Sequence, residues 1–165
     1  MNAPEKKIEV SNVIEPYFSE EKSSTNQSIN SACRMLTKEI KSSNAQVLLE
    51  RLHDLRLRHS DQVQIFLALI SNSIKFRKKK EPPIIHISSE IFGPDVIFKV
   101  EDNGIGIPQQ MWGSVFGVYN KIYANKKGAG VGLALCKAIL DDHKGYMWVG
   151  QSSNEGTTMY FSLGE

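Results

Sequence analysis

Apolar residues recur at helical spacing in three parts of the chain. The first part runs from Asn26 to Ile40 and stops at the Ser-Ser-Asn cluster of residues 42–44, the second covers residues 60–76, and the third directly follows the stretch Gly128–Leu135. Residues three and four apart share one face of a helix, so this pattern predicts three amphipathic helices that bury one side against a core. The predicted core face of the second helix consists of Val63, Phe66, Leu67, Ile70 and Ile74.

Shorter apolar runs between turn residues predict strands. These runs are Gln46–Glu50, Ile84–Ile91 and Val96–Val100, and the sequence Gly-Pro-Asp separates the last two. Because glycine, proline and aspartate favour tight turns, we expect the second and third strands to form a hairpin. A short helix is expected further along, at Gln109–Trp112.

Composition indicates one compact domain. The chain has 165 residues, of which 41% are hydrophobic, and a formal net charge of +2. These values fit a domain with a sizeable core, and the charge is too small to indicate a nucleic-acid partner. Residues 1–26 are rich in Glu, Lys and Ser and are predicted to be a linker or a weakly docked segment, which leaves residues 27–165 as the domain.

The sequence lacks a long apolar run, a secretory signal pattern and a cysteine framework. We therefore expect a cytoplasmic protein without membrane contact, in which Cys33 and Cys136 are reduced core residues. Five of the six residues Lys75–Lys80 are basic. Such a run can be a nuclear-localisation or nucleic-acid patch, but we favour a solvated helix end, because cations suit the negative end of the helix dipole.

The first stretch with candidate chemistry is Gly-Ala-Gly-Val-Gly-Leu-Ala-Leu, from Gly128 to Leu135. Alternating glycines let several backbone N–H groups converge on an anion at the N-terminus of a helix, which is the positive end of the helix dipole. The stretch therefore predicts a phosphate cradle, although a tight turn before a helix uses the same residues. It is not a P-loop, and Leu133 stands where the dinucleotide-binding fingerprint needs its third glycine.

A second stretch, Asp-Asn-Gly-Ile-Gly-Ile-Pro from Asp102 to Pro108, closes the predicted hairpin. Its aspartate would stand at the carboxyl end of a strand, where it can accept a hydrogen bond from the exocyclic amine of adenine. The glycines would let a flat ligand lie close to the backbone. An ordinary Asp-Asn-Gly turn is the alternative.

The second predicted helix places Ala68, Asn72 and Lys75 on one face. An amide and a lysine beside an apolar stripe suit a metal and phosphate site. In the alternative interpretation, Asn72 bonds to backbone groups at the sheet edge and Lys75 extends into water.

Together these stretches resemble the nucleotide-binding domain of sensor histidine kinases, within the superfamily of type II topoisomerases, ninety-kilodalton heat-shock chaperones and mismatch-repair ATPases. The matching residues are Asn72, Lys75, Asp102, Gly104, Gly106, Phe116, Gly128, Gly130, Gly132 and Leu133. The tail, 143–149 and 154–163, is similar to the closing strand pair of phytochrome-like kinases, so the resemblance extends from about residue 27 to residue 165.

The resemblance implies an α+β fold, a two-layer sandwich in which three main helices cover one face of a mixed sheet of about five strands. The strands would start near Gln46, Ile84, Val96, Tyr146 and Thr158. ATP would lie between the helices and a lid formed by the polar connection from Phe116 to Gly128, which is slightly short for this family.

The resemblance also implies ATP and Mg²⁺ as ligands and a role for each matching residue. Asp102 would accept from the adenine amine, directly and through a water held by Thr157 or Thr158, and Gly104 and Gly106 would leave room for the base. Asn72 would hold the Mg²⁺ ion. The remaining ligand contacts would come from Lys75, Phe76, the lid anchor Phe116, the lid cations Lys126 and Lys127, and the phosphate-enclosing Gly128, Gly130, Gly132 and Leu133. For Phe116, an ordinary core role is the alternative.

One departure from the family pattern affects the expected chemistry. Ala68 stands where kinases usually carry Asn and hydrolytic relatives carry a general-base Glu. Because alanine accepts no proton, we expect negligible intrinsic ATP hydrolysis. His53 begins a sequence like a phosphoacceptor box but lacks a preceding helical hairpin, so the phosphorylated histidine is expected outside this chain.

Two functions follow from these observations. The first is the ATP-binding domain of a histidine kinase, which works with a dimerisation and phosphoacceptor domain and a response regulator, mainly by positioning and charge neutralisation. The second is a degenerate or free-standing regulatory module without kinase activity. The intact Asn72, Asp102 and glycines favour the first function, and Ala68 favours the second.

Overall fold

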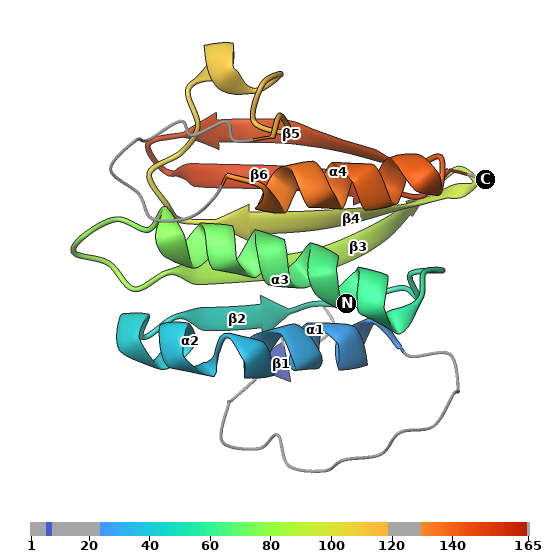
Figure 1. Ribbon diagram of the computed structural model, residues 1–165. Coiled ribbons are helices and arrows are strands. Elements are labelled where there is room, and N and C mark those ends of the chain that lie inside the picture. Colours follow the sequence, from blue (N-terminus) through green and yellow to red (C-terminus); the bar gives the residue numbers. More distant parts are fainter. Residues whose placement is uncertain (1–5, 8–23, 119–129, 165) are drawn as a thin grey trace.

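The computed structural model describes residues 6–7, 24–118 and 130–164 (Figure 1). Within these residues, the centre of the molecule is a sheet of six strands in the order β1-β2-β3-β4-β6-β5. Strands β2 and β3 are parallel and the other neighbouring pairs are antiparallel, so the sheet is mixed. The strands are β1 Lys6–Lys7, β2 Gln46–Leu49, β3 Ile84–Phe92, β4 Asp95–Asp102, β5 Tyr146–Ser153 and β6 Gly156–Ser162.

All the predicted strands are present, and β1 adds a sixth at the edge of the sheet. Lys6 and Lys7 pair antiparallel with Leu49 and Leu48, although they belong to the segment predicted as a linker or weakly docked helix. The rest of that prediction concerns residues that, apart from Ser24 and the start of the first helix, lie outside the described part. A very short edge strand limits further pairing at that edge of the sheet.

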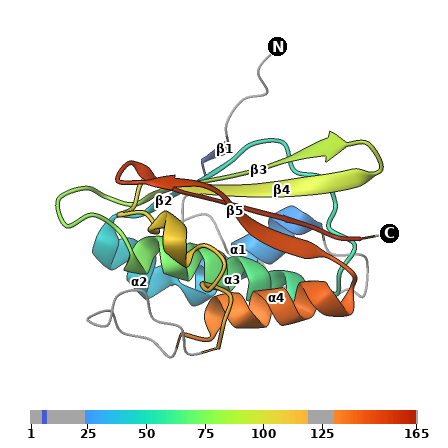
Figure 2. The same cartoon turned by 90° about the horizontal axis from the view of Figure 1, so that it is seen from above.

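The α-helices lie together on one face of the sheet, and Figure 2 shows the two layers from the side. This arrangement confirms the predicted two-layer α+β fold. In the described residues the α-helices are α1 Thr25–Met35, α2 Thr37–Ser43, α3 His59–Lys75 and α4 Gly132–Asp142, and a 3-10 helix, η2, spans Gln109–Met111.

The first predicted helix is divided in two at Leu36. The N–H of Leu36 is shared between the carbonyls of Ala32 and Cys33, at 3.1 and 3.2 Å, and the hydroxyl of Thr37 donates to the carbonyl of Arg34 at 2.7 Å. Leu36 has φ −99° and ψ 16°, and this departure from helical dihedrals divides the helix. Apolar periodicity passes through the interruption, so the sequence pattern alone predicted one helix.

An aromatic cluster fixes α3 over the centre of the sheet. The rings of Phe98 on β4 and Phe161 on β6 stack with centroids 5.0 Å apart. Phe66 on α3 meets both rings edge-on, at 6.5 and 5.9 Å. All three side chains are almost completely buried, and such ring pairs add about 0.5–1.5 kcal/mol each beyond the burial of their area. The cluster therefore holds the middle of α3 over the central strands β4 and β6.

The basic run after α3 lies at a helix end, as expected. Helix α3 stops at Lys75, and the guanidinium of Arg77 donates to the carbonyl of Ile74 at 2.9 Å. Lys78 is 3.7 Å from the carboxylate of Glu81. A cation bonded to one of the last helix carbonyls satisfies a group that has no partner within the helix.

Both cysteines are buried and unpaired, as predicted. Burial raises the pKa of the Cys33 thiol to about 11 and that of the Cys136 thiol to about 12. Because the thiolate is the reactive form, both residues behave as inert core side chains.

Candidate functional site

A pocket lies between the C-terminal half of α3, the carboxyl end of β4 and strand β6. Residues of α3 at spacings of three and four turn toward it together, as the helical period requires. Its lining is largely apolar with a few polar groups, which is typical of small-molecule sites. The lining residues are Leu69, Asn72, Ser73, Phe76, Val100, Asp102, Gly106, Ile107, Leu133, Thr157 and Met159.

Asp102 is the only acidic side chain that lines this pocket, and three described groups donate hydrogen bonds to it. The N–H groups of Gly104 and Thr157 donate to Oδ1 at 2.9 and 3.2 Å. The hydroxyl of Ser73 donates to Oδ2 at 2.9 Å. A carboxylate offers about four lone-pair sites. Among the described residues, one acceptor site on Oδ2 therefore remains for a ligand.

Burial raises the pKa of Asp102 above the ordinary value for an aspartate, and the hydrogen bonds from Gly104, Ser73 and Thr157 oppose that rise. Desolvation disfavours the charged form, whereas donors stabilise it. The site therefore holds a partly desolvated acceptor whose ionisation depends on these three donors.

Glycines let three backbone segments meet around Asp102. A Cβ on Gly104 would lie 2.7 Å from the carbonyl oxygen of Phe76 at the end of α3. Gly106 has φ +79°, and a Cβ there would collide with the carbonyl of Ser153. Any side chain at Gly104 or Gly106 would push the loop away from its neighbours. These glycines are thus needed for contact with the protein itself as well as for a ligand.

Gly156 plays a similar part at the start of β6, directly after the turn from β5. It has φ +138°, and a Cβ there would collide with the backbone carbonyl of Asp102. Asp102 pairs with Thr157 in the β4–β6 ladder. The close approach at Gly156 therefore lets the last residue of β4 sit directly beside the first residues of β6.

Ser152 links the glycine loop to β6. Its hydroxyl oxygen accepts from the N–H of Ile107 at 2.6 Å and lies 2.8 Å from the hydroxyl of Thr157. The hydroxyl also lies 3.3 Å from the carbonyl of Gly156. The Ser152 side chain therefore connects the loop that follows Asp102, the β5–β6 hairpin and the pocket-lining residue Thr157.

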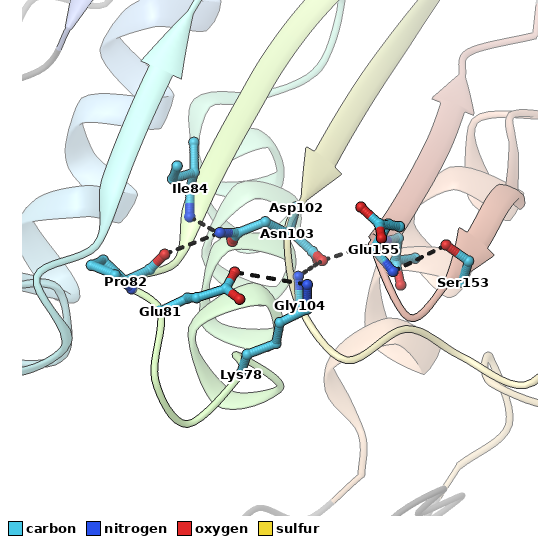
Figure 3. A network of polar contacts seen from close by, with 10 residues as sticks. Lys78, Glu81, Pro82, Ile84, Asp102, Asn103, Gly104, Ser153 and Glu155 are labelled. Atoms are coloured by element: carbon cyan, nitrogen blue, oxygen red, sulfur yellow. Dashed lines mark hydrogen bonds and ion pairs between the residues drawn. The ribbon is translucent and has the colours of Figure 1, made fainter.

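Asn103 fixes the other side of the loop, as Figure 3 shows. Its side-chain oxygen accepts from the N–H of Ile84 at 2.8 Å, and its side-chain nitrogen donates to the carbonyl of Pro82 at 3.1 Å. This amide ties the residue after Asp102 to the start of β3. The Asp-Asn-Gly sequence therefore makes long-range contacts in addition to its local turn.

The sequence family described as "Histidine kinase-, DNA gyrase B-, and HSP90-like ATPase" matches residues 59–165, which include every residue that lines the pocket. The chain belongs to this family. Cyanobacterial phytochrome A of Nostoc sp. is 34% identical over 139 residues, which are 83% of this chain and 18% of the relative. The methanogenesis regulatory histidine kinase FilI of Methanothrix harundinacea is 37% identical over 95 residues, 58% of this chain and 11% of the relative. The chain thus spans less than a fifth of these curated relatives.

Solved structures show the same fold. The catalytic domain of histidine kinase ThkA has a TM-score of 0.68 and 26% identity, covering 84% of this chain and 92% of that one. The mycobacterial sensor histidine kinase MprB also has a TM-score of 0.68, with 20% identity, and covers 86% of this chain and 95% of that one. No helix in the described residues is long and apolar enough to cross a membrane.

The structure places several predicted site residues of this family member in the pocket. These are Asn72, Phe76, Asp102, Gly106, Leu133 and Thr157. The side chain of Thr158 belongs to the opposite face of the sheet, because neighbouring residues of a strand alternate and Thr158 pairs with Glu101. Of the two threonines proposed to hold a water, Thr157 is therefore the one beside Asp102. Gly104 lies next to the pocket, where its N–H binds Asp102.

The predicted phosphate and metal groups lie on α3 and at the start of α4. No hydrogen bond engages the side-chain amide of Asn72 within the described residues, so the alternative in which it satisfies backbone groups is not observed. The ammonium of Lys75 lies 5.0 Å from the centre of the Phe76 ring. A Cβ on Gly132 would lie 3.5 Å from the Ala68 methyl group, so α4 begins close against α3.

Other predicted residues are peripheral or undescribed. Phe116 is half-buried against the core and does not line the pocket, which agrees with its alternative core role. Gly130 has φ +70° and directly precedes the turn into α4. Lys126, Lys127 and Gly128 lie outside the described residues, as does most of the predicted lid. In the described part no three His, Cys, Asp or Glu side chains form a metal-binding group.

Sequence reasoning missed three contributors to the site, Ser73, Ser152 and Gly156. Ser73 follows Asn72 directly and so falls on the same helix face, which is a signal that could have identified it. Ser152 and Gly156 act through the pairing of β5 with β6, where Ser152 faces Thr157. The resemblance predicted this strand pair but not its register.

Proposed function

We propose that this domain binds Mg-ATP and donates the γ-phosphoryl group to a histidine on a separate dimerisation domain of a sensor histidine kinase. The observation that carries the proposal is the pocket in which Asp102 keeps one acceptor site open while the amide of Asn72 has no described hydrogen bond. The family match over residues 59–165 supports it. A protein with a similar fold, full-length ShkA, was solved in complex with AMPPNP.

At the base end, Asp102 accepts from the exocyclic amine of adenine. The ring lies against apolar side chains of the pocket, among them Val100, Ile107 and Met159. Thr157 lies on β6 beside Asp102, and its hydroxyl is suited to hold a bridging water. The lining therefore suits a ligand with a flat apolar ring that carries an amino group.

At the phosphate end, the oxygen of the Asn72 amide is a ligand suited to Mg²⁺, which usually retains waters and shares phosphate oxygens rather than occupying an all-protein cage. This fits the lack of an acidic cluster among the described residues. Lys75 neutralises phosphate charge, and the backbone amides from Gly130 to Leu133 stand where α4 opens. The undescribed Lys126, Lys127 and Gly128 are proposed to complete the enclosure.

In the transfer step, a histidine nitrogen of the dimerisation domain bonds to the γ-phosphorus while the bond to the β–γ bridging oxygen breaks and ADP leaves. The nitrogen loses its proton to a base outside this chain. The residues of this domain act by positioning the nucleotide and by spreading phosphate charge over Asn72, Lys75 and the glycine amides. Ala68 supplies no base, so hydrolysis by water is expected to be negligible.

A response regulator is the proposed downstream partner. The kinase ThkA, which shares this fold, was solved in complex with the response regulator TrrA. A cytoplasmic location accords with this role, since nucleotide and regulator are both found there.

A regulatory module without kinase activity is the second candidate. Ala68 favours it, because this alanine stands where kinases usually carry a polar side chain. The two candidates differ in phosphotransfer and not in nucleotide binding.

Isothermal titration with AMPPNP and Mg²⁺ is expected to show one binding site. Radiolabelled ATP is then expected to label a supplied dimerisation domain in the presence of this protein. Absence of binding would contradict the nucleotide site. Binding without transfer to any of several supplied dimerisation domains would favour the regulatory module.

Replacing Asn72 by Ala is expected to abolish most of the gain in AMPPNP affinity that Mg²⁺ provides, a loss of about tenfold or more. Affinity measured in EDTA should change little, because the base contacts remain. Gln64→Ala, an exposed change on the same helix, is the matched control. An equal loss with and without Mg²⁺ would show that Asn72 does not bind the metal.

A further inference from the structure

A serine hydroxyl binds the Asp102 carboxylate at the wall of the pocket. Ser73 is 4% exposed and lines the pocket, and its hydroxyl donates to Oδ2 of Asp102 at 2.9 Å. A serine hydroxyl has one hydrogen and two lone pairs. Because the hydrogen is used on Asp102, the oxygen of Ser73 can only accept from a ligand.

The acceptor sites of Asp102 are therefore unequally occupied. Oδ1 receives two backbone N–H groups, from Gly104 and Thr157, which fill its lone pairs. Oδ2 receives only Ser73 among the described residues, so its second site is open. A ligand at this end of the pocket meets two neighbouring acceptors, the open site on Oδ2 of Asp102 and the hydroxyl oxygen of Ser73. An amino group fits this pair, and a carbonyl group does not.

We propose that Ser73 is a positioning residue that keeps the Asp102 carboxylate ionised and directs its last open acceptor site, on Oδ2, to the amino group of the bound base. The proposal rests on the nucleotide-binding function given above. It assigns to Ser73 a part of base recognition that acts through Asp102.

The surroundings of Asp102 make this one hydroxyl important. Burial disfavours the ionised carboxylate, and among the described residues the groups that favour it are Gly104 on the loop, Ser73 on α3 and Thr157 on β6. No charged side chain among the described residues contributes to the pKa of Asp102. The other two donors are backbone N–H groups, so Ser73 is the described donor that substitution can remove without moving the chain.

The test is Ser73→Ala, with Ser71→Ala as a matched control on the same helix, since no described hydrogen bond involves the Ser71 side chain. AMPPNP affinity is measured with Mg²⁺ over a series of pH values from acidic to slightly alkaline, because burial raises the pKa of Asp102 above its ordinary value. Ser73→Ala is expected to weaken binding about threefold to tenfold at the alkaline end. Its affinity should also fall away at a higher pH than that of the wild type. Ser71→Ala should match the wild type throughout.

The titration of Asp102 in the ligand-free protein, followed by carbon NMR, separates this proposal from the nucleotide-binding function. Ser73→Ala is expected to raise the pKa of Asp102 relative to the wild type. A weaker-binding variant with an unmoved pH profile and an unmoved Asp102 pKa would overturn the positioning role. Failure of the wild type to bind nucleotide would overturn the proposed function, and the NMR titration would still decide the role of Ser73.

Discussion

Replacing Asp102 by Asn is expected to reduce ATP affinity by at least about 100-fold and to leave the fold intact. The amide oxygen can take over from Oδ1 and accept from Gly104 and Thr157. The amide nitrogen then occupies the place of Oδ2, where the hydroxyl of Ser73 can rotate to accept from it. The amine of the base would meet this amide nitrogen, a donor facing a donor. Titration with AMPPNP measures the loss.

Stability measurements distinguish this loss of recognition from unfolding. The pKa of Asp102 is raised in the folded protein, so its contribution to stability is fully present at low pH and is lost as pH rises through that pKa. At neutral pH a neutral amide avoids this cost, and Asp102→Asn should be at least as stable to urea as the wild type. Asp95→Asn, at the other end of β4, serves as the matched control. If Asp102→Asn left the affinity unchanged, Asp102 would not recognise the base, and the proposed site would be wrong at its central residue.

Replacing Gly106 by Ala is expected to lower the free energy of unfolding by at least about 2 kcal/mol and to weaken ATP binding more than tenfold. Alanine disfavours the observed φ of +79°, and its Cβ would collide with the carbonyl of Ser153. Relief of that collision moves the loop, which breaks the bond from Ile107 to Ser152 and displaces the N–H of Gly104 from Asp102. Urea unfolding and AMPPNP titration measure the two effects.

Gly113→Ala is the matched control for this change. A Cβ on Gly113 would meet nothing within 4 Å, and its φ is not among the positive values of the described glycines. The control should therefore keep both stability and affinity. Equal behaviour of the two variants would mean that the loop at Gly106 tolerates a side chain and that its approach to β5 is not required for the site.

Much of the architecture follows from short-range pattern. The strands of the β3–β4 hairpin and the long helix α3 appear within a few residues of their predicted bounds, because alternation and helical period are properties of adjacent residues. The break at Leu36 was not predicted, because the change of backbone dihedrals at Leu36 leaves the apolar stripe of the helix unchanged. Pairing of Lys6–Lys7 with β2 was likewise missed, since two lysines carry no strand signal of their own.

The surroundings of Asp102 show where sequence reasoning stops. The choice between Thr157 and Thr158 depended on the β4–β6 register, which places Asp102 opposite Thr157. A shift of one residue would exchange the two side chains between the faces of the sheet. Glycine at position 106 was expected to make room for a base, and the structure shows that the backbone of Ser153 already uses part of that room.

The sequence by itself determined the helices, the main strands, the family and the principal candidate residues, because each of these is specified by residue type and local spacing. Only the tertiary structure decided which groups donate to Asp102 and how many of its acceptor sites stay open. Ser73, Gly104 and Thr157 come from a helix, a loop and a strand, and their meeting depends on strand register and helix packing, which no local pattern encodes.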